Sequence, residues 1–355
     1  MKLSKSLVIG LIAICSLNAC SSPNKEQPGI KEMDYNQPKT VCIGRLEVNV
    51  PKETQVTYGP LNFNGSDFEI EASVKSYQDY QKYIKDKIET LKNSPHETEG
   101  TLLKQELPGP MKAIDGSISY ILVSRPTEYT KTSYEIYGYL YLGMKQLLIL
   151  KSSASNEYLD RSINRMQHNL KSIKIRAPKG ENQAGLCWDK IFIVDNMDEN
   201  RHFNASVSFT FPSYPEVRAH VDNRGRYESD APFIAMVKQN KAELPLEVKT
   251  LTKDTEINIA EREVNGLLGE EYSINTALRK PFQRGFEIMD WQYLGNLDDP
   301  HHPLIGFHLS SENEKDNEGY GDALVNQKAV VQLGHFILSS IRVSSNNEVN
   351  KDGEK

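Results

Sequence analysis

The sequence has 355 residues but only four cysteines and two tryptophans, and after its first residues no long apolar run. A helix needs about 20 consecutive apolar residues to cross a bilayer, so no membrane-spanning segment is expected after the N-terminal region. Basic residues are not in excess, because 48 Asp and Glu outnumber 42 Lys and Arg. Nucleic acid is therefore excluded as a partner, and binding of the protein body to anionic lipid is not expected.

Known catalytic motifs are also lacking: there is no Gly-x-Ser-x-Gly, His-Glu-x-x-His, phosphate-binding glycine-rich loop or Cys-x-x-Cys. Asp298–Pro303 holds two aspartates and two histidines, but a proline-broken turn does not project zinc ligands well. Asp195–Asn200 lacks the glycine and the distal Glu of a calcium loop, so a turn is predicted there too. Glu261–Glu263 and Glu270–Glu271 are interpreted as solvated faces. We expect no catalytic residues, metal, cofactor or small-molecule substrate, and therefore no enzyme.

The N-terminus is predicted to be a signal peptide, Met1–Ala19. Lys2 and Lys5 precede an apolar run, Leu7–Ile14, which is too short to span a bilayer but fits a secretory signal. A small residue then precedes Cys20, which is the arrangement that a lipoprotein signal peptidase cleaves. We predict that Cys20 is acylated, with palmitate among its chains; an ordinary signal with a chance cysteine is the alternative.

This lipidation predicts a periplasmic protein whose only contact with the membrane is its lipid anchor. Several acyl chains on one cysteine anchor stably. Ser21 follows the cysteine, with no Asp to indicate retention in the inner membrane, so the outer membrane is favoured. Residues 20–40 are polar and predict a flexible tether, and residues 344–355 predict a disordered tail. Loss of the signal's two lysines leaves 40 basic against 48 acidic residues, a net charge of −8.

Cys15 leaves with the predicted signal peptide and Cys20 is predicted to be acylated, so two cysteines remain, Cys42 and Cys187, and these are predicted to form a disulfide. Two cysteines in an oxidising compartment more often pair than stay free, although two buried free thiols are the alternative. The bond would close a loop of 187 − 42 = 145 residues. In the chain-entropy model such a loop stabilises a fold by up to about 4–5 kcal/mol.

Between the predicted tether and tail, the chain divides into two similar modules, residues 41–178 and 183–343. Both end alike, in Leu170–Ile175 and Leu338–Val343, after an amphipathic helical pattern. Both open with a cysteine before a short strand. We predict an α+β fold in which each module is a mostly antiparallel sheet with packed helices; chance similarity of short strand ends is the alternative.

Several elements inside the modules are predicted individually. Ser76–Asn93 is predicted to be a helix with a capping-box-like start at Ser76 and Asp79, and a second helix is predicted near Ala231–Gln239. Alternating patterns predict two hairpins and two opening strands; these are Tyr134–Tyr141 with Gln146–Leu150, Phe286–Tyr293 with Leu304–Leu309, Cys42–Pro51, and Cys187–Val194. The 17 tyrosines fit sheet packing, or interface anchors where they are exposed.

An ordered set of segments carries a family resemblance. Cys42–Pro51, Gly185–Cys187, Gly285–Trp291, Pro303–Leu309 and Phe336–Arg342 resemble, in order, segments of the type VI secretion immunity proteins that pair with phospholipase effectors. The resemblance extends over about residues 40 to 343. It implies a periplasmic protein that binds and inhibits a cognate phospholipase toxin and so protects the producing cell and its siblings.

The resemblance also implies how inhibition would work. Two clamp-like domains would hold the lipase and block either substrate access or lid movement. Tight binding would need a few buried aromatic or Arg anchors, whose identity the sequence leaves unknown. Two other functions stay open: an envelope-assembly or adhesion lipoprotein with a protein partner, and an unrecognised hydrolase.

Overall fold

The structure is a computed structural model that describes residues 33–112, 118–143, 146–177, 183–196, 202–243, 256–275, 287–311 and 327–344. All of these residues belong to one compact unit, Glu32–Lys355. Cys20 and the predicted signal peptide lie outside the described residues. None of the described helices is both long and apolar enough to cross a membrane.

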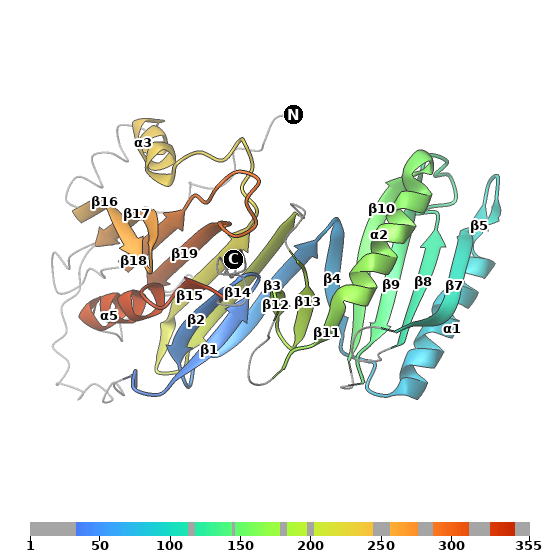
Figure 1. The fold of residues 1–355 in the computed structure, drawn as a ribbon, viewed down its shortest axis with the longest axis horizontal. Helices are drawn as coiled ribbons and strands as arrows, with labels where there is room; N and C mark the ends of the chain where they lie inside the picture. Colours follow the sequence, from blue (N-terminus) through green and yellow to red (C-terminus); the bar gives the residue numbers. More distant parts are fainter. Residues whose placement is uncertain are drawn as a thin grey trace, which may run out of the picture. The chain divides into compact units, whose positions relative to one another are not determined.

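One antiparallel sheet of 12 strands runs through both halves of the unit (Figure 1). Its order is β16-β17-β18-β19-β15-β14-β3-β4-β10-β9-β8-β7. The strands of the N-terminal half are β3 (Gln55–Phe63), β4 (Ser66–Glu71), β7 (Leu103–Lys112), β8 (Ile118–Ser124), β9 (Ser133–Tyr141) and β10 (Leu147–Ser155). Those of the C-terminal half are β14 (Phe203–Phe211), β15 (Tyr214–Arg224), β16 (Glu256–Val264), β17 (Leu267–Asn275), β18 (Glu287–Tyr293) and β19 (Leu304–Ser311).

The two halves have the same plan, as the sequence predicted. Outward from the central β3–β14 pair, each half presents its first strand, its second strand, and then its last four strands in reverse chain order. The predicted hairpins β9–β10 and β18–β19 are both confirmed. The α+β fold class is confirmed, and the pairing of β3 with β14 joins the two half-sheets into one.

Helices occupy matching places in the two halves. In the N-terminal half α1 (Tyr77–Asn93) follows β4, and α2 (Leu159–Ser172) follows β10 after the short 3-10 helix η1 (Asn156–Tyr158). In the C-terminal half α3 (Phe233–Glu243) follows β15, and α5 (Gln327–Leu338) follows β19.

The capping-box-like start predicted for α1 is present, with the reciprocal bond coming from Lys75, one residue before the N-cap Ser76. The Ser76 side chain accepts a hydrogen bond from the Asp79 amide at 3.1 Å, and the Asp79 carboxylate accepts one from the Lys75 amide at 3.2 Å. Both bonds satisfy amides that have no partner within the helix. The local sequence alone therefore fixes where α1 begins.

The sheet of the N-terminal half is covered on both faces. Helix α2 packs its apolar stripe, Ile163, Met166 and Leu170, into the main core, while α1 packs Tyr80 and Ile84 into a second cluster. Strands buried on both faces lose their polar alternation, which explains the continuous apolar runs of β8 and β10. The main core contains residues of both halves, so the two half-sheets share it.

In two small sheets, the opening hairpin of each half pairs with the closing strand of the other half. The opening hairpin β1 (Pro38–Ile43) and β2 (Leu46–Pro51) pairs with β20 (Arg342–Val343), the closing strand of the C-terminal half. The hairpin β12 (Gly185–Trp188) and β13 (Ile191–Val194) pairs with β11 (Ile173–Ile175), the closing strand of the N-terminal half. A third, two-stranded sheet joins β5 (Pro95–His96) and β6 (Gly100–Thr101).

Three predictions are corrected by these elements. Cys42–Pro51 and Cys187–Val194 are not single strands but hairpins, and each cysteine lies within the first strand of its hairpin. The predicted tether extends too far, because Met33 is 4% exposed in the core and β1 already begins at Pro38. The predicted tail starts too early, because Ser344 is buried and its amide donates to the Arg45 carbonyl.

Candidate functional site: the disulfide-linked junction

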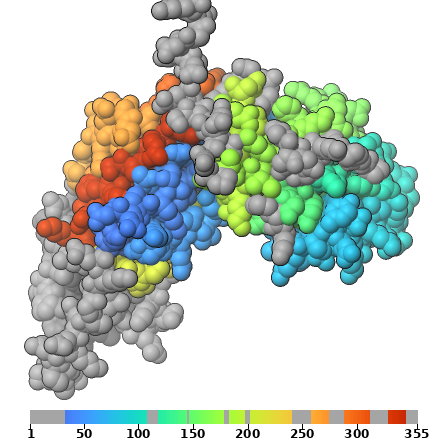
Figure 2. Space-filling model, turned by 60° about the horizontal axis from the view of Figure 1, so that its bottom comes forward, coloured from blue at the N-terminus to red at the C-terminus, as the bar shows by residue number. Residues whose placement is uncertain are grey.

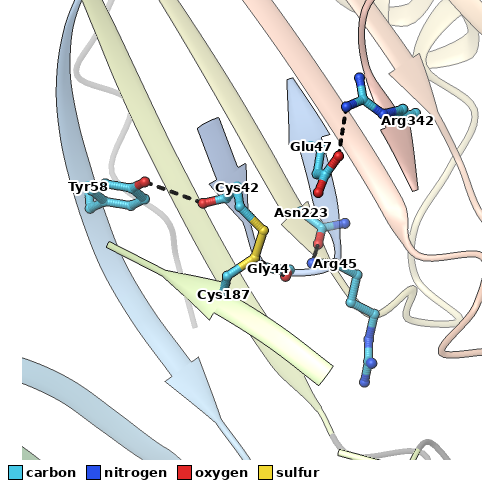
Figure 3. Close-up of a disulfide and its surroundings, with 8 residues drawn as sticks. All are labelled: Cys42, Gly44, Arg45, Glu47, Tyr58, Cys187, Asn223 and Arg342. Carbon is cyan, nitrogen blue, oxygen red and sulfur yellow. Dashed lines mark hydrogen bonds and ion pairs between the residues drawn. A yellow bond between two sulfur atoms is a disulfide. The ribbon is translucent and has the colours of Figure 1, made fainter. Parts of the chain in front are cut away.

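The two opening hairpins meet at a disulfide between Cys42 and Cys187, whose Cα atoms are 5.8 Å apart (Figure 3). Both residues are at most 5% exposed. Beside the bond, Gly44 and Cys187 exchange two backbone hydrogen bonds of 2.7 and 2.9 Å. The disulfide and these two backbone hydrogen bonds together join the start of one half to the start of the other.

Gly44 is required at this point. Its φ of +54° lies in the left-handed region, and a Cβ there would lie 2.4 Å from the Asn223 side-chain oxygen. That oxygen accepts a hydrogen bond from the Arg45 amide at 2.8 Å (Figure 3). The β1–β2 turn is therefore bound to β15 through a side chain that only a glycine lets approach.

A buried ion pair accompanies the disulfide. An Arg45 guanidinium nitrogen lies 2.6 Å from an Asp195 carboxylate oxygen, and both side chains are completely buried. The guanidinium carbon also lies 4.9 Å from the centre of the Phe203 ring. The sequence predicted a turn at Asp195 but not its buried ion pair with Arg45. The only local sign of this pair is that an acidic residue directly follows the buried strand β13.

A second acid was also misassigned. Glu271, predicted to be on a solvated face, is 7% exposed and forms an ion pair with Arg262 at 2.5 Å. Arg262 also contacts the His335 ring nitrogen at 2.8 Å, and burial is the main cause of a lowered His335 pKa. Glu270 accepts a hydrogen bond from the Ile234 amide in α3. Glu270 therefore binds helix α3 directly, while Glu271 holds the Arg262 side chain that contacts α5.

The aspartate–histidine cluster folds into the turn that was predicted. Asp299 accepts hydrogen bonds from the His301 amide at 2.9 Å and lies 2.6 Å from the His302 ring nitrogen. Asp298 has a φ of +57°. Among the described residues, no group of three or more metal-ligating side chains converges.

The nearest arrangement to a catalytic set lies on the open face of the C-terminal half. Ser208 is 3.1 Å from a His220 ring nitrogen, and His308 is 2.5 Å from Asp290. Burial lowers the His220 pKa and raises that of neighbouring Asp222. One row across β14, β15, β19 and β18 contains Ser208, His220, His308 and Asp290 in that order. None of them lines the groove beside α1 or the groove at β3 and β4.

The tyrosines concentrate on the N-terminal half, between α1 and the sheet. Seven of them pack with the α1 cluster there; these are Tyr77, Tyr80, Tyr83, Tyr120, Tyr137, Tyr139 and Tyr141. Burial is the main reason why the pKa of Tyr120 and that of Tyr137 rise to about 12. Sheet packing thus accounts for most of this group, while Tyr129 and Tyr158 are exposed.

One groove of about 710 Å³ opens beside α1, and another of about 740 Å³ opens at β3 and β4. Figure 2 shows part of the surface of the described halves. Tyr77, Tyr80 and Tyr120 line the first groove. Both are lined chiefly by apolar and aromatic side chains, which suits contact with another protein better than proton transfer.

The two halves of the fold correspond to two domains of a known family of immunity proteins. Two family models match the chain: the N-terminal domain of Tle cognate immunity protein 4 at residues 39–180, and the C-terminal domain of the same protein at 181–346. The chain therefore belongs to the Tle cognate immunity protein 4 family. Comparison with curated proteins finds no match.

Solved structures share the fold. "The crystal structure of Tle4-Tli4 complex" contains a chain that superposes with a TM-score of 0.73 at 17% identity, over 88% of this chain and 99% of that one. The apo immunity protein TplEi of the T6SS from Pseudomonas aeruginosa gives a TM-score of 0.71, also at 17% identity and with the same coverage. A TplEi structure with an "L" peptide gives 0.69.

Proposed function

We propose that this chain is a periplasmic immunity protein that binds and inhibits a phospholipase effector of a type VI secretion system. The observation that carries the proposal is family membership over residues 39–346, across both halves of one continuous sheet. The related structures include a complex with Tle4, which supports a toxin as the partner. The chain then acts by binding and not by catalysis.

The junction supports this function physically. A binding surface that is already rigid before the partner binds loses less conformational entropy on binding, and so binds more tightly. A disulfide and a buried ion pair both join the halves where the central strands β3 and β14 meet. We propose that the Cys42–Cys187 bond forms in the oxidising periplasm and holds the two halves in one binding-competent arrangement.

Protection of cells is the direct test. We expect periplasmic expression of this chain to restore growth of cells that also secrete the phospholipase encoded beside its gene. The purified chain should retain that phospholipase on a column and abolish its hydrolysis of phospholipid vesicles. A family member whose natural toxin differs is the control and should give no protection. Equal killing with and without this chain would refute the proposal.

We further propose that the mature chain begins at Cys20, is acylated there and is held on the outer membrane. The anchor would raise the local concentration of inhibitor beside the lipids that the toxin attacks. We expect Cys20→Ala to leave binding in solution unchanged but to lower protection in cells. The measurements are an affinity with purified proteins and survival under toxin expression, with Cys20→Ala exported behind a signal for soluble proteins. Full protection by that soluble form would contradict a need for the lipid.

A further inference from the structure

The 12-stranded sheet has a fork at its centre. Strands β3 and β4 pair only near their shared turn, through Leu61 with Phe68, Asn62 with Asp67, and Phe63 with Ser66. Beyond these pairs β3 continues along β14, and β4 continues along β10. Figure 1 shows the two strands diverging from their turn. Gln55–Pro60 and Glu69–Glu71 thus form two strand edges that face a gap.

The sequence explains why the strands separate. β3 carries a bulge opposite Ala205–Val207 in β14, at Gly59 and Pro60. A bulge bends its strand, which turns β3 away from β4, and proline offers no amide to a neighbour. A Cβ on Gly59 would lie 2.1 Å from the Ser206 hydroxyl, so only glycine permits this approach.

The gap leaves backbone groups without a neighbouring strand. In an antiparallel ladder, alternate residues direct their N–H and C=O groups to opposite sides, so part of each edge points into the gap. One carbonyl has a substitute donor: the Trp188 indole nitrogen donates to the Gly59 carbonyl at 2.9 Å. In the described part of the chain, no strand pairs with either edge inside the gap. The fork is therefore an open template for one more strand.

A groove of about 740 Å³, a size typical of binding sites, coincides with the fork. Its apolar lining comes from Val56, Tyr58, Phe68, Ile70 and Trp188. Phe68 and Trp188 are buried and Tyr58 is half-buried, so their side chains form the floor of the groove. Such a floor can accept every second side chain of an extended segment.

The rim of this groove is acidic. Asp67, Glu69 and Asp189 line it with one cation, Lys151, which is paired with Glu69. Among the described residues that line the groove, three acids therefore face one base, and the Arg176 side chain lies close enough to hydrogen-bond Tyr58. An extended segment that places Lys or Arg between apolar residues complements both the rim and the floor.

We propose that the fork between β3 and β4 receives an extended, basic segment of the phospholipase effector as an added strand. Main-chain hydrogen bonds would give affinity, and the Trp188 floor and acidic rim would select the side chains. This inference rests on the proposed function, because the occupant belongs to the proposed toxin. To the proposed function it adds the site at which the toxin is bound and the main-chain hydrogen bonding that binds it.

Amide hydrogen exchange tests the strand addition. The full chain is measured alone and with the phospholipase encoded beside its gene, inactivated at its nucleophile. We expect exchange at amides within Val56–Thr57 and Glu69–Glu71 to slow at least about tenfold in the complex. Overlapping synthetic peptides of that phospholipase should contain one basic, extended segment that gives the same protection. Tight complex formation without slower exchange at these amides would overturn the fork as the site while leaving the proposed function intact.

Charge variants give an independent readout. Asp67→Lys should weaken the complex about threefold to tenfold, and the loss should shrink at high salt. Asp86→Lys, an equal charge change on the exposed face of α1, is the matched control and should have little effect. Equal affinities for Asp67→Lys and the unaltered chain would overturn the acidic rim. Absence of any complex with the unaltered chain would instead overturn the proposed function and, with it, the assignment of the fork.

Discussion

Replacing Arg45 with alanine is expected to lower the free energy of unfolding by about 3–5 kcal/mol, because it leaves the Asp195 carboxylate buried without its guanidinium. Both side chains are completely inaccessible and lie 2.6 Å apart. The variant also loses the contact between the guanidinium and the Phe203 ring. Urea unfolding followed by tryptophan fluorescence measures the change, since Trp188 in the β12 hairpin and Trp291 in β18 are both buried.

Two further variants separate the charge effect from lost packing. The pair Arg45→Met with Asp195→Leu should recover much of the stability, because apolar side chains of similar size carry no desolvation cost. Arg342→Ala is the control: its ion pair with Glu47 is 2.7 Å long but partly exposed, so a loss below about 1 kcal/mol is expected. Equal losses of unfolding free energy for Arg45→Ala and Arg342→Ala would show that the buried ion pair stabilises the fold no more than an exposed one.

Removal of the disulfide is expected to have the next largest effect. The double variant Cys42→Ser with Cys187→Ser avoids a stray thiol and should unfold more easily by up to about 4–5 kcal/mol, since the bond closes a loop of 145 residues. For a chain of this size that corresponds to a drop of up to about 7 °C in Tm. Differential scanning calorimetry under oxidising conditions is the measurement.

Reductant provides the matching control. The unaltered chain with an excess of dithiothreitol should melt near the double variant, and dithiothreitol should not change the variant itself. Because the bond joins the two halves, its loss should also weaken binding of the phospholipase if a fixed arrangement of the halves matters. A Tm that neither substitution nor reductant lowers would argue against a stabilising bond.

Features that depend on neighbouring residues were predictable from the sequence. The capping box at Ser76 and Asp79 fixed the start of α1, because its donors and acceptors lie within four residues. Helical spacing correctly marked the buried stripes of α2 and α5. The hairpin β9–β10 followed from alternation on both sides of Gly143, whose φ is +61°.

Features that depend on distant residues were not predictable. Asp195 reads as a turn residue because its partner Arg45 lies 150 positions away, in the β1–β2 turn. Glu271 reads as a solvated acid because its partner Arg262 lies on the neighbouring strand β16, 9 positions away. Only packing decides that such acids are buried. The opening strand was misread for the same reason: the turn at Gly44 is specified by its contact with Asn223, which is remote in sequence.

By itself the sequence determined the α+β class, the likeness of the two halves and the family, since each depends on local periodicity or on residues in order. The tertiary structure decided that the halves share one sheet and exchange their opening hairpins, because strand pairing joins segments far apart in the chain. It also decided where the sheet forks. A bulge at Gly59 acts only against the strand beside it, so no local pattern could reveal the groove that it opens.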